Sequence, residues 1–238
     1  MKCCHDQGVK DREWREFLDV LGEHTELVVS ECAETDLTKP SALPGWSRAH
    51  VVAHLIGNAR GLGRLTRWAR DGIERPMYPS MEAREADIVQ RAAWSDDELV
   101  LALGQSALEL QHELETLDDE GRARIVWRNT QLSFPGDRIP ALRLQEVVIH
   151  HTDLGHGTYG HDQWPDELVQ QMWRASVKEY SAREDAPLGF MNDVTLNDNT
   201  VGVRGSENAI LAWLIGRSAG ADLEVVGADV LPTPPPWR

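Results

Sequence analysis

The chain has 238 residues and a formal net charge of −15, because 39 Asp and Glu outnumber 24 Lys and Arg. This length is enough for one large domain or two small ones, each able to bury a core. The acidic balance argues against nucleic acid or an anionic membrane surface as the main partner. A small-molecule partner fits the composition better.

The three cysteines, Cys3, Cys4 and Cys32, are odd in number and show no framework spacing. A disulfide scaffold is therefore not expected, and a reducing compartment fits best. The first residues lack the apolar core of a signal peptide, and no run approaches the roughly 18 apolar residues of a membrane span. We expect a soluble cytoplasmic protein, either a monomer or a small homo-oligomer.

The first half of the chain has the spacing of amphipathic helices. Apolar residues recur every three or four positions over 11–33, which predicts the first helix. Ser47 is a suitable N-cap for a second helix, and a third is expected to start within 81–88. Ser95 and Glu98 form a capping-box pattern before a strict apolar repeat. These segments predict packed helices.

The last helix of this half carries the polar residues of most interest. Pro140 suits its first turn, and Glu146 and His150 follow. Between this helix and the preceding one, residues 124–140 have the pattern of a short strand or hairpin. The N-terminal domain, 1–157, is therefore predicted to be an antiparallel four-helix bundle in which two facing helices supply metal ligands.

The character of the sequence changes after Gly157. A helix is expected from Pro165 to about Ala182, and another is expected to begin at Ser206. Strand-like pieces lie at 194, 201–203 and 223–227. Residues 158–238 are thus predicted to form a smaller C-terminal α/β domain, which makes the fold class α+β.

Polar groups converge on one face of the helix that carries Glu146. At about 100° per residue, Glu146, His150 and Asp153 fall within a ~60° arc. His54, on an earlier helix, lies in an apolar stripe and is the natural complement. Two His and one Glu match a metal site with three protein ligands and an open position, which is typical of catalytic zinc. His151 points roughly 100° away and suits a structural role.

A simpler interpretation remains open on spacing alone. His50 and His54 can share a helix face by accident, and Glu146 with His150 can be a helical ion pair. Asp153 can bond locally near the end of its helix, or it can orient a histidine ligand through that ring's second nitrogen. The spacing favours neither interpretation.

The same residues resemble a known family, the mycothiol-dependent maleylpyruvate isomerases, whose N-terminal half belongs to the DinB-like metal-binding bundles. The resemblance spans nearly the whole chain and consists of motifs in a fixed order. These motifs are LPGWSRAHVVAHLIGNA (43–59), RPMYPSMEAREADI (75–88), QEVVIHHTDLGHG (145–157), AILAWLIGRSAG (209–220) and the PPPW ending (234–237).

The resemblance implies zinc, or another divalent metal, bound by His54, Glu146 and His150, with Asp153 beside it as a catalytic residue. It also implies that Arg217, in the C-terminal helix, reaches the active site and contacts mycothiol and the reacting groups. The alternative for Arg217 is a cation favoured at a helix C-terminus.

The resemblance further suggests Arg84 and Tyr78 as substrate contacts, although a solvated helix start would look the same. The implied reaction belongs to the gentisate branch of aromatic degradation. The mycothiol thiolate adds to the cis double bond of maleylpyruvate, the single bond rotates, and elimination gives fumarylpyruvate. Two alternatives remain: a mycothiol S-transferase or thiol-exchange enzyme acting on another electrophile, and a non-enzymatic metal- or thiol-binding sensor.

Overall fold

The computed structural model describes residues 2–181, 188–190, 201–227 and 229–231. It divides into two compact units, Met1–Gly155 and His156–Arg238. The first is helical with one small hairpin, and the second combines helices with a three-stranded sheet. The predicted α+β fold class is therefore confirmed. The strand-like piece at 194 and the motif at 234–237 lie outside the described residues.

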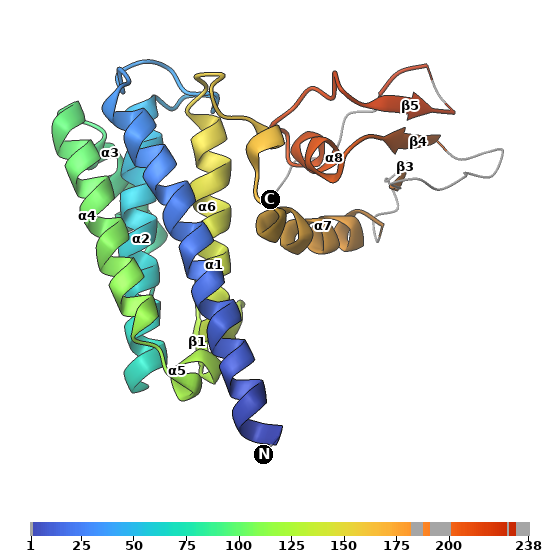
Figure 1. Ribbon diagram of the computed structural model, residues 1–238. Helices are drawn as coiled ribbons and strands as arrows, with labels where there is room; N and C mark the ends of the chain where they lie inside the picture. The colour runs from blue at the N-terminus through green and yellow to red at the C-terminus, as the bar shows by residue number, and fades with distance from the viewer. Residues whose placement is uncertain (1, 182–187, 191–200, 228, 232–238) are drawn as a thin grey trace. The chain divides into compact units, whose positions relative to one another are not determined.

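Four long helices form the bundle of the first unit, and shorter elements connect them (Figure 1). The elements are α1 (Lys2–Ala33), α2 (Arg48–Asp71), α3 (Met81–Arg91), α4 (Asp96–Glu115), α5 (Asp119–Ala123), β1 (Ile125–Trp127), β2 (Ser133–Pro135), the 3-10 turn η1 (Gly136–Arg138) and α6 (Ile139–Asp153). The first helix begins at Lys2 rather than at residue 11, where the apolar repeat starts.

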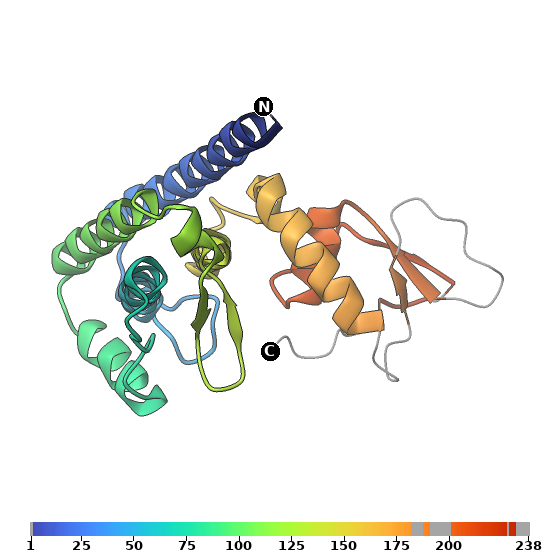
Figure 2. The same ribbon diagram turned by 90° about the horizontal axis from the view of Figure 1, so that it is seen from below.

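The four long helices are α1, α2, α4 and α6, and α4 and α6 each pack against both α1 and α2. They therefore lie at opposite corners of the bundle, as the end-on view shows (Figure 2). The segment from residue 72 through α3 runs back along α2, so α2 and α4 point one way and α1 and α6 the other (Figure 1). Two helices thus run in each direction.

Local signals set the ends of the central helix. Ser47 caps the N-terminus of α2, as predicted, and its side chain accepts from the backbone N–H of His50. Gly72 ends the helix in the left-handed conformation, with φ of 76°, which glycine adopts without strain. Most side chains of α2 are buried, including the fully enclosed Leu55 and Leu65. Burying each such leucine contributes about 1.5–3 kcal/mol.

The predicted capping box at the start of α4 is present, since Ser95 and Glu98 bond to each other's backbone N–H. Pro140 lies in the first turn of α6, as predicted. The hairpin expected between these helices is also present, because β1 and β2 pair antiparallel. The hairpin strand β1 and the turn η1 both contact α2, and η1 leads directly into α6, which packs against α2.

The second unit contains the short turn η2 (His161–Gln163), α7 (Asp166–Ser181), β3 (Leu188–Phe190), β4 (Val201–Arg204), α8 (Glu207–Leu214) and β5 (Glu224–Val226). Strand β4 is central, with β3 parallel on one side and β5 antiparallel on the other. Ser206 caps α8, as predicted. Among the described residues, no helix is both long and apolar enough to span a membrane.

Candidate metal centre

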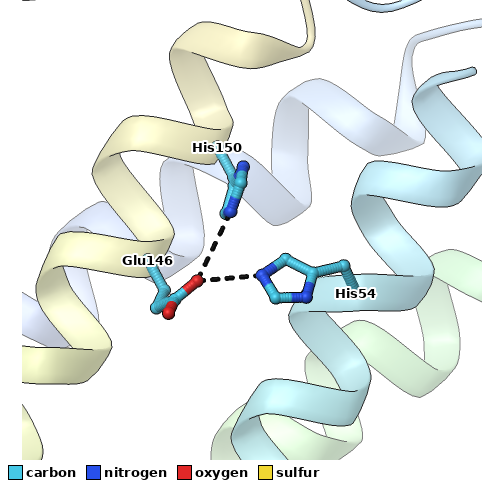
Figure 3. A group of neighbouring side chains, drawn as sticks. All are labelled: His54, Glu146 and His150. Carbon is cyan, nitrogen blue, oxygen red and sulfur yellow. Dashed lines mark hydrogen bonds and ion pairs between the residues drawn. The ribbon is translucent and has the colours of Figure 1, made fainter. Parts of the chain in front are cut away.

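The first histidine of the centre comes from α2. His50 is occupied by the capping box, where its Nδ1 lies 2.7 Å from the Ser47 Oγ. One turn further along, His54 is only 5% exposed and its ring faces α6 (Figure 3). The two histidines four residues apart are therefore not a ligand pair, because one belongs to the helix cap and the other to the interior.

The other two groups of the centre come from α6. Glu146 lies between the two imidazoles, with its Oε2 2.9 Å from His54 Nε2 and 3.4 Å from His150 Nε2 (Figure 3). One donor atom from each residue lies within 4.8 Å of the others. Imidazole nitrogens and a carboxylate oxygen this close together fit the donor set of a site with three protein ligands for zinc or a similar divalent metal.

The Nδ1 atoms of His54 and His150, which do not contact Glu146, have partners of opposite charge. His150 Nδ1 lies 2.8 Å from Oδ2 of Asp153, a carboxylate that is 2% exposed. His54 Nδ1 lies 3.0 Å from Nη2 of Arg84. A carboxylate accepts and a guanidinium only donates, so His150 carries hydrogen on Nδ1, whereas His54 accepts there and donates through Nε2 to Glu146.

Burial and these partners shift the pKa values of the cluster. Burial would raise the pKa of Glu146, but hydrogen bonds from His150 and His54 hold it well below its ordinary value. Burial lowers the pKa of His54. Burial also opposes the charged form of His150, yet hydrogen bonds to Asp153 and Glu146 raise its pKa above the ordinary value. The carboxylate is thus kept ionised between one neutral ring and one that gains a proton readily.

Two aromatic side chains and a cation border the cluster. The Arg84 guanidinium lies 5.8 Å from the centre of the Tyr78 ring, a cation–π distance. The Trp46 ring lies 5.9 Å from that of His54. The structure therefore brings both predicted substrate contacts next to the candidate ligands. It also places Trp46, the residue before the Ser47 N-cap, beside His54.

His151 points away from the centre, as predicted. It is buried, and its Nε2 lies 3.1 Å from Oε2 of Glu31 on α1, so it links α6 to α1. Arg217 belongs to the second unit. It lies in the turn after α8 rather than within a helix, because α8 ends at Leu214 and Gly216 adopts a positive φ of 74°. Its Nη1 donates to the Ile215 carbonyl, and its part in the site stays a prediction.

A second polar layer below the centre was missed in the sequence. Arg143, three residues before Glu146, is 1% exposed and reaches across to α2. Its Nη1 donates to the Leu55 carbonyl and to Asn58 Oδ1, both at 2.9 Å. The sequence feature that could have predicted this layer is a single arginine between two leucines, on the same face of α6 as Glu146. A buried cation therefore lies next to the candidate metal centre, between α6 and α2.

The fold and the site together define the class of protein. It is a four-helix bundle in which two imidazoles and a carboxylate from facing helices form a candidate metal centre. Residues 18–155, more than half of the chain, match the sequence model of the mycothiol maleylpyruvate isomerase N-terminal domain. The chain belongs to this family. All three candidate ligands lie inside the matched segment.

Solved structures share the fold over almost the whole chain. The crystal structure of the mycothiol-dependent maleylpyruvate isomerase superposes with a TM-score of 0.84 at 24% identity, covering 94% of this chain and 97% of that one. A histidine-to-alanine mutant of that enzyme gives the same values. No curated protein sequence matches the chain. The shared fold thus includes the C-terminal unit as well as the bundle.

Proposed function

We propose that the chain is a metal- and mycothiol-dependent isomerase that converts maleylpyruvate to fumarylpyruvate. The observation that carries this proposal is the cluster of His54, Glu146 and His150, which lies within the segment matched by the family. The names of the family and of the similar crystallised enzyme both contain the words mycothiol and maleylpyruvate isomerase. We further propose 1–157 as the metal-binding domain and 158–238 as the C-terminal α/β domain of the family.

The donor set supports a resident divalent metal, with zinc as the first choice. When bound, such a metal would lower the pKa of a coordinated thiol, so that mycothiol could add to the cis double bond as a thiolate at neutral pH. Burial raises the pKa of Cys32 to about 12, so this side chain is unsuited to act as the nucleophile. We therefore propose that mycothiol, rather than Cys32, supplies the thiol.

In this proposal the chain's own residues orient the metal ligands and bind the substrate. Asp153 fixes the His150 ring through Nδ1, which leaves Nε2 directed at the cluster. Arg84 supplies a cation beside His54, where it can pair with a substrate carboxylate, and Tyr78 lies against its guanidinium. Arg217 is proposed to contact mycothiol and the reacting groups from the second domain.

Turnover assays test the proposal directly. Zinc-loaded protein with mycothiol should remove the cis absorbance of maleylpyruvate catalytically, without consuming thiol. His54→Ala and His150→Ala should lose zinc binding and turnover together, because each removes one of three ligands. His112→Ala is the matched control, since His112 is an exposed histidine on α4 outside the cluster. Full zinc occupancy in both ligand variants would refute the assignment.

The same assays separate the two alternatives. Stoichiometric loss of thiol with an electrophile, and no isomerisation, would identify a mycothiol S-transferase or thiol-exchange enzyme. Zinc binding without turnover of either kind would identify a sensor. Either outcome would overturn the isomerase proposal, and the ligand assignment would survive both.

A further inference from the structure

A groove runs between α1 and α4 on the side of the bundle away from the contact of α2 with α6. Its volume is about 790 Å³. Leu21 and Val29 of α1 and Leu110 of α4 form apolar walls. The groove continues inward to Arg143, which belongs to α6 at the corner opposite α4. It therefore reaches from the surface to a buried arginine.

Two glycines in this groove are not required by the packing of the chain itself. Gly22 lies within α1 and Gly104 within α4, and both line the groove. Glycine inside a helix costs about 1 kcal/mol relative to alanine. Close approach of a neighbour often explains such a glycine, but a Cβ built at either position would meet nothing within 4 Å. The space above both helices is therefore open.

Arg143 has hydrogen-bonding capacity that the described residues do not use. Its Nη1 donates to two neutral acceptors on α2, whereas its Nη2 is buried and has no partner among the described residues. No ion pair involves Arg143 in the part of the chain that the structure describes. A buried donor without a partner costs about 1–3 kcal/mol, and buried charges are normally paired. Burial lowers the pKa of Arg143 to about 10, which still leaves it charged at neutral pH.

We infer that this α1–α4 groove is a binding site for a monocarboxylate with an apolar body, whose carboxylate pairs with Arg143. A carboxylate provides the missing acceptor for Nη2 and adds to the favourable charge of Glu146, and guanidinium–carboxylate pairs are strong. The apolar walls cover the rest of the molecule. The rim carries Asp19, Glu23 and Glu26, all exposed, which repel a second negative charge on the ligand. The site goes beyond the proposed isomerase function, which does not use it.

Octanoate is a suitable probe, with 1-octanol as its neutral counterpart of equal chain length. Calorimetric titration of the full-length protein should show saturable 1:1 binding of octanoate and at least tenfold weaker binding of octanol. Gly104→Leu should weaken octanoate binding at least tenfold, because it fills the groove while improving helix propensity. Gln105→Leu adds the same side chain at the next, exposed position outside the groove and should leave the affinity unchanged.

Arg143→Met tests the charge separately from the shape. Methionine keeps an unbranched side chain and removes the guanidinium, so octanoate binding should fall at least tenfold. His150→Ala should leave octanoate binding unchanged, which separates the groove from the candidate metal centre. The inference is overturned if octanoate shows no saturable binding, if octanol binds equally well, or if Gly104→Leu or Arg143→Met retains the original affinity.

Discussion

The two histidines of the candidate metal centre differ in their readiness to bind a metal. A histidine that ligates through Nε2 must carry its hydrogen on Nδ1. His150 already does, because Asp153 accepts from that nitrogen. His54 has the opposite arrangement, because Arg84 donates to its Nδ1. Metal binding through His54 Nε2 therefore requires Arg84 to leave, and we predict that Arg84→Met binds zinc more tightly.

The size of the effect follows from the contact that is lost. A hydrogen bond from a charged group contributes about 1.5–3 kcal/mol. The Arg84 side chain is 20% exposed and lies close to water, so the lower end of that range applies. About 1.5 kcal/mol corresponds to roughly a tenfold change in an equilibrium constant. Removing a cation beside a divalent metal acts in the same direction, so a tenfold tightening is a minimum.

Chelator competition at pH 7.5 measures this prediction for the original protein and two variants. Arg91→Met is the matched control: it removes an arginine from the same helix, α3, that pairs with Asp87 at 2.7 Å instead of with a histidine. Its zinc affinity should not change. Equal or weaker zinc binding by Arg84→Met would refute the reasoning and would mean that Arg84 holds His54 in place for the metal.

Two further predictions concern Asp153 and Cys32. Asp153→Asn should weaken zinc binding about 10- to 100-fold in the same competition assay, because it removes the charged acceptor that orients His150; an unchanged affinity would contradict this. The pKa of Cys32 is raised from 9.0 to about 12, first by burial and then by Glu31. The buried neutral thiol therefore contributes fully to the free energy of unfolding below pH 9, and this contribution is lost as the pH rises toward 12. Relative to Cys32→Ala, the free energy of unfolding should fall by about 1.4 kcal/mol per pH unit above 9 in denaturant titrations, and parallel profiles would exclude this.

Local signals were sufficient for much of the fold. Ser47 and the Ser95–Glu98 pair mark helix starts because their side chains satisfy backbone N–H groups a few residues away. The convergence of Glu146 and His150 also follows from helical spacing alone. The interpretation of Arg217 as a helical residue was wrong, because α8 ends at Leu214 and the backbone turns at Gly216, before Arg217.

Contacts between distant segments could not be predicted in the same way, because they depend on side-chain reach. Arg84 meets His54 from thirty residues away, and Arg143 meets Asn58 from a different helix. Spacing within α2 and within α6 places each residue on a face, but it does not fix how far one helix slides along the other. That register is a property of the folded pair.

The two polar layers together account for the register of α2 against α6. In the observed arrangement His54 faces Glu146, and one turn away Asn58 faces Arg143. Sliding α6 by one turn in one direction would place the Arg143 guanidinium against the His54 ring. Sliding it the other way would place Arg143 against the apolar Leu62, where its Nη1 would lose the hydrogen bond that it now makes to Asn58, which is costly for a buried cation. Of these three registers, only the observed one makes both the His54–Glu146 and the Asn58–Arg143 hydrogen bonds, so the buried cation helps to determine which residues meet in the candidate metal centre.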